Sequence, residues 1–179
     1  MGKEVVLFRS KTGYTLRYAQ WISRALDCEL REIQNVKLSD LESYDTLIIG
    51  GSVYLGALKG MDFLLKNWTY LVHKKIYILM VGLEEPDTKR VEKIWRRQFT
   101  SQQRRQLRYY YVKGGLNYER LGIFDKAIIL LFKLLMQTTK TGKGKTQGFI
   151  GNLRCPVDFT NRESIEPLIK DIKKGRECM

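Results

Sequence analysis

The sequence predicts an α/β fold, a doubly wound parallel β-sheet with helices on both faces. Short apolar runs alternate along the chain with stretches in which apolar residues recur at helical spacing. Strands and helices that alternate in this way form right-handed βαβ units around a parallel sheet. The length of 179 residues suits one domain with an ordinary core, or one domain that carries an insertion.

The first half of the chain supplies three expected strands and two expected helices. Residues 3–8 end in an apolar run and form the first strand, and residues 15–26 carry apolar side chains at helical spacing and form the first helix. A short candidate strand at 30–33 precedes a buried strand at 46–50. A loop then leads to a helix over about 59–71.

The second half continues the alternation. Residues 75–82 form an apolar strand, residues 91–105 a basic helix, and residues 107–113 a strand rich in tyrosine. The last helix covers about 162–173. About fifty residues separate it from the tyrosine-rich strand, far more than an ordinary connection. We therefore expect a single domain over the whole chain, 1–179, with an insertion at about 115–160.

Positive charge is concentrated in the second half of the chain. The formal net charge is +13, yet residues 1–60 are almost balanced. Residues 89–113 contain nine basic residues, with Glu92 as the single acidic one. This asymmetry predicts an anionic partner, either a small-molecule substrate or a redox partner.

The termini and the metal-ligating residue types narrow the setting. Lys3 and Glu4 lead directly into the first strand without the apolar segment of a signal peptide, so we expect a cytoplasmic protein. The three cysteines form no CxxC pair, and His73 lies outside the candidate loops. We expect no metal site.

The segment between the first strand and the first helix predicts a phosphate-binding loop. N–H groups at a helix N-terminus have no partner within the helix and carry partial positive charge. Serine and threonine hydroxyls donate to phosphate oxygens, and glycine allows a close approach of the backbone. The segment consists of Ser10, Lys11, Thr12, Gly13, Tyr14 and Thr15. A second loop, at the end of the strand 46–50, would meet it in a crevice at the edge of the sheet.

These two loops resemble the FMN-binding loops of the flavodoxin family. Ser10-x-Thr12-Gly13-x-Thr15 is similar to the FMN-phosphate loop, and residues 51–56 are similar to the second flavin loop. The resemblance implies five parallel strands in the order 2-1-3-4-5, a long helical insertion before the last helix, and FMN as cofactor. The residues that it implies for the flavin ring are Ser52, Val53, Tyr54, Leu55 and Gly56 on one side, with Tyr54 in stacking or edge contact, and Gly82 and Leu83 on the other.

The insertion is similar to that of menaquinone-dependent protoporphyrinogen oxidases. The similarity rests on Gly115-Leu116-Asn117-Tyr118, on Phe124-Asp125-Lys126, and on the apolar stretch 121–137 with its Lys/Thr-rich sequel. It implies an FMN-dependent oxidoreductase of haem biosynthesis that oxidises protoporphyrinogen with a quinone acceptor. FMN would carry the chemistry, and no catalytic side chain is singled out.

Several alternatives remain open. The stretch 121–137 is too short and too charged for a transmembrane span, so it packs on the domain, covers a substrate pocket, or lies on a membrane. In the last case residues 121–145 would hold the protein peripherally at the inner face of the cell membrane. The alternative function is a flavodoxin-type electron carrier, although such carriers are usually acidic. A nucleic-acid binder that uses 89–113 is a remote alternative, and we expect no nucleic acid as partner.

Overall fold

The computed structural model describes residues 3–54, 56–83, 85, 87–117, 122 and 157–177. The chain divides into two compact units, one made of Met1–Gly114 with Phe159–Met179 and the other of Gly115–Asp158. In the second unit the described residues include β7 (Gly115–Leu116) and β8 (Val157–Asp158), which pair antiparallel.

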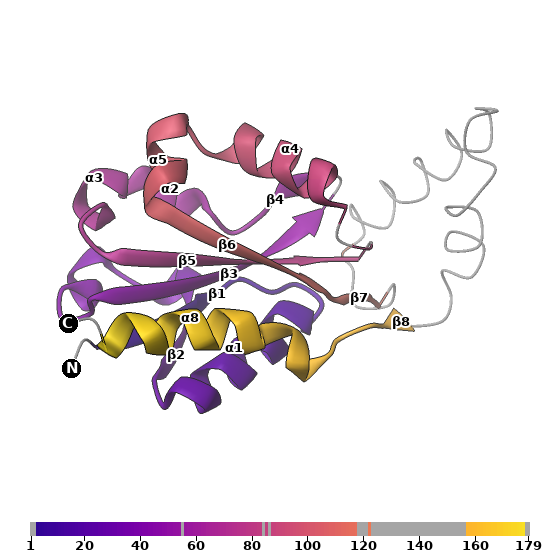
Figure 1. Cartoon of the computed structure of the whole chain (residues 1–179), viewed down its shortest axis with the longest axis horizontal. Coiled ribbons are helices and arrows are strands. Elements are labelled where there is room, and N and C mark those ends of the chain that lie inside the picture. Colours follow the sequence, from indigo (N-terminus) through magenta and orange to yellow (C-terminus); the bar gives the residue numbers. More distant parts are fainter. Residues whose placement is uncertain are drawn as a thin grey trace. The chain divides into compact units, whose positions relative to one another are not determined.

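Five parallel strands form the main sheet of the first unit, in the order β2-β1-β3-β5-β6 (Figure 1). Their bounds are Glu4–Phe8 (β1), Glu29–Glu32 (β2), Thr46–Tyr54 (β3), Lys75–Gly82 (β5) and Leu107–Lys113 (β6). A two-residue strand, β4 (Ala57–Leu58), pairs antiparallel with the end of β3. The predicted fold class and strand order are confirmed.

Helices cover both faces of this sheet (Figure 1). One face carries α1 (Tyr14–Leu26) and α8 (Glu166–Glu177), and the other carries α2 (Asp62–Lys66), α3 (Trp68–Leu71), α4 (Thr88–Gln98) and α5 (Ser101–Gln106). Short 3-10 turns are η1 (Ile33–Asn35), η2 (Leu38–Leu41) and η4 (Arg162–Ile165).

Two apolar cores follow from the alternation of side chains along the strands. Val5 and Leu7 of β1 belong to the core that also contains Ile94 of α4. Val6, between them, belongs to the core that contains Ile22 of α1 and Leu168 of α8. Each helix layer is therefore fixed to the sheet by burial of its own apolar face.

The expected helix over 59–71 is wrong in its extent. The structure has two short helices, α2 and α3, and neither includes Gly60, whose φ of +90° is not helical. Asn67 separates them, and its side-chain amide donates to the carbonyl of Phe63 (2.8 Å). This local hydrogen bond competes with continuation of the helix.

The expected helix over 91–105 is also divided. α4 begins three residues earlier than expected, at Thr88, because the Asp87 carboxylate accepts from the N–H of Lys89 (3.0 Å). It ends before Phe99, whose backbone is extended. α5 starts anew because the Thr100 hydroxyl and the Gln103 side chain form a capping box.

Two further bounds differ from expectation. β3 continues to Tyr54 instead of ending at Gly50, because its last residues pair with β4. The last helix is a 3-10 turn followed by α8, which extends to Glu177.

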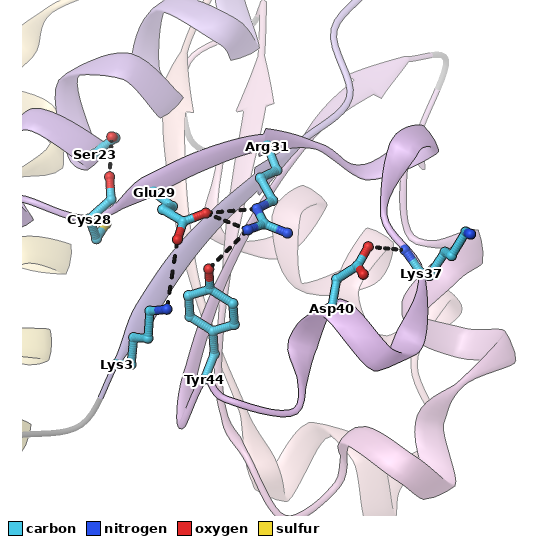
Figure 2. A network of polar contacts seen from close by, with 8 residues as sticks. All are labelled: Lys3, Ser23, Cys28, Glu29, Arg31, Lys37, Asp40 and Tyr44. Carbon is cyan, nitrogen blue, oxygen red and sulfur yellow. Dashed lines mark hydrogen bonds and ion pairs between the residues drawn. The ribbon is translucent and has the colours of Figure 1, made fainter.

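The edge strand β2 carries a charged network around Glu29 and Arg31 (Figure 2), while Leu30 between them packs against the apolar core. Arg31 donates from Nε and Nη2 to Glu29 Oε2 (2.8 and 2.5 Å) and from Nη2 to the Tyr44 hydroxyl (3.3 Å). Lys3 Nζ lies 3.7 Å from the other oxygen of Glu29. Charged side chains of this kind discourage pairing of an exposed edge with another chain.

Candidate functional site

The predicted site residues that the structure describes follow or end neighbouring parallel strands. Residues 10–13 follow β1, residues 51–54 form the end of β3, and Gly82 ends β5. The N–H of Arg9 donates to the carbonyl of Gly50 (3.1 Å), which holds the first segment beside β3. The carboxyl ends of parallel strands share one edge of a sheet, where doubly wound folds bind their ligands.

The loop before α1 has the geometry of an anion-binding turn. Gly13 is the N-cap residue of α1, and its φ of 95° is a left-handed conformation that favours glycine. Its N–H donates to Ser10 Oγ (3.1 Å). No side chain caps α1, and its first turn contains no acidic residue. A helix start with a left-handed glycine and no carboxylate in its first turn is a suitable place for an anion, because the helix dipole is positive there.

The hydroxyl-bearing residues of this loop differ in burial. Thr15 is 3% exposed, and its Cγ2 lies 3.1 Å from the position that a Cβ on Gly50 would take. Thr12 is half-buried, and Lys11 is exposed. Tyr14 is 8% exposed, and its ring belongs to the core beneath α1. The ring of Tyr14 is therefore a core side chain, which the sequence alone did not predict.

The second predicted segment, expected as a loop after the strand 46–50, is the end of β3 and the turn into β4. Val53 pairs with Leu58 and Tyr54 with Ala57, and Gly56 takes a φ of +74° at the turn. Ser52 accepts from the N–H of Lys59 through its carbonyl (2.8 Å). Tyr54 is half-buried. Leu55 lies outside the described residues.

Gly51 is required where it stands. A Cβ on Gly51 would overlap the carbonyl oxygen of Lys59 and would lie 2.8 Å from Met61 Cε. The return of the chain after β4 therefore packs directly against the backbone of β3. This contact fixes where the hairpin stands at the edge of the sheet.

The third segment, at Gly82, is held by Tyr111 and Gly114, which were not among the residues expected at the site. A Cβ on Gly82 would overlap the Tyr111 hydroxyl, so the phenol of Tyr111 lies directly against this glycine. The N–H of Gly114 donates to the carbonyl of Gly82 (2.6 Å). Leu83 is half-buried, and Glu84 lies outside the described residues.

Tyr111 is also electrostatically distinct. Burial raises the pKa of its phenol and the Glu85 carboxylate adds to this rise, while the Arg90 guanidinium opposes it. The phenol therefore stays protonated at neutral pH. Gly82 is in register with Lys113, so Tyr111, two residues before Lys113, is its diagonal neighbour on the same face of the sheet. A glycine and a tyrosine at such positions near the ends of neighbouring strands were the signal that could have identified this pair.

Most of the insertion lies outside the described residues. The similarity to the oxidase insertion depends on Tyr118, on 124–126 and on 121–137, which apart from Gly122 lie outside the described residues, as do Lys140, Lys143 and Lys145. In the part of the chain that is described, no helix is both long and apolar enough to cross a bilayer. The same part contains no group of three histidine, cysteine or acidic residues that could hold a metal ion.

The strand order and the helices on both faces define a doubly wound α/β protein, with a glycine-containing turn between its first strand and its first helix. The sequence matches the family described as "Flavodoxin domain" over residues 5–147. The chain therefore belongs to the flavodoxin domain family. A search of curated proteins returned no match.

The solved structures that are similar to this chain include the three that follow. A WrbA-like flavodoxin of Agrobacterium tumefaciens is 15% identical, with 70% of this chain and 88% of that chain covered and a TM-score of 0.44. Oxidised flavodoxin 1 of Bacillus cereus is 20% identical, with 77% and 99% covered and a TM-score of 0.40. The Trp repressor binding protein of Bacillus subtilis is 16% identical, with 63% and 85% covered and a TM-score of 0.43.

Membership of this family implies FMN as cofactor. The residues present fit its phosphate group. The Ser10 hydroxyl accepts from Gly13 and retains its own hydrogen for donation, and α1 has neither a side-chain cap nor an acidic first turn. A Cβ on Gly50 would lie 3.1 Å from Thr15 Cγ2, so this glycine lets the backbone of β3 lie close to the start of α1.

Proposed function

We propose that the protein is an FMN-dependent oxidoreductase that oxidises a reduced anionic substrate, with protoporphyrinogen as the substrate and a quinone as the acceptor. The observation that carries the proposal is the combination of a flavodoxin-type phosphate turn with a net charge of +13. A carrier that only exchanges electrons has no need of a surface that attracts carboxylates. A porphyrinogen bears propionates, which a positive protein draws towards itself.

The residues have distinct parts in this proposal. The hydroxyls of Ser10, Thr12 and Thr15, together with the N–H groups at the start of α1, hold the phosphate. Tyr54 and Leu83, on the hairpin and after β5, flank the flavin ring. When bound, FMN supplies the transfer of electrons between the substrate and the acceptor.

Tyr111 and Gly114 would set the position of the segment after β5. They contact Gly82 from the end of β6, so the chain that leads to Leu83 has a fixed start. Lys113 forms an ion pair with Glu85, which fastens the same connection a few residues further on. A preorganised connection lowers the entropy lost when it meets a ligand.

An anaerobic assay tests the proposal. The purified protein is mixed with protoporphyrinogen and a menaquinone analogue, and porphyrin fluorescence is followed. We expect porphyrin to form only when FMN and the quinone are both present, and expect a Thr12→Val, Thr15→Val variant to need more added FMN. A protein that binds FMN and is reduced by a strong donor, yet does not react with this pair, would instead be an electron carrier.

A further inference from the structure

The exposed side of α4 carries five cations and one acidic residue, Glu92, which pairs with one of them. Val91, Ile94 and Trp95 are buried against the sheet. The opposite face presents Lys89, Arg90, Lys93, Arg96 and Arg97, all of them exposed. Glu92, on the flank, pairs with Arg96 (2.5 Å). We call Lys89, Lys93 and Arg97, which follow one another at four-residue steps, the α4 stripe.

The α4 stripe destabilises the helix that carries it. Like charges four residues apart on a helix repel, and the stripe contains two such pairs, Lys89 with Lys93 and Lys93 with Arg97. Lys89 also stands in the first turn, where the helix dipole favours anions. No carboxylate of the described residues pairs with any of the three side chains. A feature that costs stability and satisfies no internal partner points to an external one.

The neighbouring cations have structural roles that the α4 stripe lacks. Arg104 donates to the carbonyls of Arg96 (3.3 Å) and Phe99 (2.6 Å), at the end of α4. Arg108 donates to both oxygens of Asp171 on α8 (2.5 and 2.7 Å). Part of the positive charge of residues 89–113 therefore stabilises the fold through hydrogen bonds and ion pairs. The side chains of the α4 stripe make no contact of this kind with the described residues.

The aromatic residues nearby are not available as stacking platforms for nucleic acid. The ring of Tyr109 packs on Trp95, with centroids 4.7 Å apart. The Tyr110 hydroxyl donates to Asp171 (2.7 Å), and Tyr111 lies against Gly82. Binding of single-stranded nucleic acid depends on aromatic rings whose faces can stack with bases, whereas these three rings are engaged within the protein.

A protein partner is also a poor match for the α4 stripe. The cores of protein interfaces are built on buried aromatic and aliphatic residues. The large apolar side chains that are exposed in the described part are Tyr70 and Phe159, and neither lies on α4 or α5. A purely ionic helix face, with long basic stems and no apolar anchor, suits a fluid surface of fixed negative charge.

We propose that the α4 stripe docks the protein on an anionic lipid bilayer. This inference rests on the proposed function in one respect, because the quinone acceptor dissolves in the bilayer and an enzyme that reduces it has to reach that surface. α4 begins at Thr88, directly after the connection from Gly82 that we place beside the flavin. Docking along α4 therefore holds that connection near the source of the quinone. Attachment is electrostatic and reversible, since the α4 stripe carries no apolar residue.

Vesicle sedimentation tests the inference without reference to activity. The full-length protein is mixed with two kinds of vesicle, one of phosphatidylcholine alone and one in which phosphatidylglycerol makes up about a third of the lipid. Each mixture is measured at low and at physiological salt concentration. We expect binding only to the anionic vesicles, with a decline as salt screens the charges. A Lys89→Gln, Lys93→Gln, Arg97→Gln variant should bind about a hundredfold more weakly.

A charge-matched control separates the α4 stripe from net charge. The control removes three exposed cations, one at the start of η2, one in α2 and one in α8, by the substitutions Lys37→Gln, Lys66→Gln and Lys173→Gln. This variant should bind anionic vesicles within about threefold of the unmodified protein, because only cations at the bilayer surface contribute fully. Equal loss of binding in both variants would overturn the inference.

Two further readouts complete the test. Thermal unfolding of the α4 stripe variant should occur at the same temperature as in the unmodified protein or higher, because the substitutions relieve repulsion within α4. If the α4 stripe variant binds anionic vesicles as tightly as the unmodified protein, the bilayer is not the partner. A loss of affinity for a DNA duplex or for poly-glutamate in that same variant would then show which polyanion the α4 stripe binds. Sedimentation of apoprotein and FMN-loaded protein should agree, so the docking result does not depend on the proposed reaction.

Discussion

Removal of the threonine hydroxyls from the phosphate turn should weaken FMN binding and leave riboflavin binding unchanged. Riboflavin has the same ring system but no phosphate, so it reports contacts to the ring alone. Thr12 and Thr15 are the positions to change, each to valine. Valine keeps the methyl group that Thr15 places against Gly50, so the packing of this buried residue is preserved.

The expected magnitude follows from the number of hydrogen bonds lost. A hydrogen bond to a charged group contributes about 1.5–3 kcal/mol. The N–H groups at the start of α1 remain in each variant, so we expect the lower end of this range. Each substitution should then raise the Kd of FMN about tenfold, and the double variant about a hundredfold.

The assay is titration of apoprotein with either flavin, followed by quenching of flavin fluorescence. Thr46→Val is a matched control, because Thr46 is also buried but lies at the start of β3, at the opposite edge of the sheet. It should change neither Kd. If Thr12→Val and Thr15→Val weaken FMN and riboflavin equally, the hydroxyls do not contact the phosphate. An unchanged Kd for FMN in the double variant would refute the phosphate assignment altogether.

Three further predictions concern side chains outside the turn. Arg176 donates to both carboxylate oxygens of the buried Glu4 (2.7 and 2.5 Å). Arg176→Met should therefore lower the free energy of unfolding, measured in urea, by about 2–3 kcal/mol. A decrease of less than about 0.5 kcal/mol would show that the ion pair is dispensable. Burial raises the pKa of Cys28 to about 11. In a variant with the other two cysteines changed to serine, the Cys28 thiol should react with a disulfide reagent at pH 8 at least about tenfold more slowly than free cysteine. Equal rates would contradict this prediction. Gly82→Ala should lower both the thermal stability and the affinity for FMN, because the added methyl group meets the phenol of Tyr111. A second substitution in that variant, Tyr111→Leu, should restore most of the loss. If the loss is the same with either residue at position 111, the contact does not exist.

The strands were predictable because their signals are local. The bounds of β5 and β6 agree with the expected 75–82 and 107–113, since each apolar run stops at turn-forming or charged residues. The division of the basic helix was also readable in principle, because Thr100 and Gln103 have the spacing of a capping box. The helix over 59–71 failed because its apolar pattern continues through Gly60 and Asn67, whose backbone conformations interrupt it.

The site was predictable as segments but not as contacts. The order of hydroxyls and glycine in residues 10–15 predicts an anion-binding turn without knowledge of the fold. The burial of the Tyr14 ring and the approach of Tyr111 to Gly82 depend on how α1 packs and on the register between β5 and β6. Such cross-strand relations are set by the whole sheet and not by neighbouring residues in sequence.

The content of flavin in the purified protein tests the central claim most directly. The protein is saturated with FMN, freed of unbound flavin by gel filtration and denatured with acid, and the released flavin is identified and quantified by chromatography. The account predicts about one FMN per chain, with a visible absorption spectrum that shifts on binding. A protein that retains no flavin, and whose addition leaves the fluorescence of free FMN unchanged, would contradict it.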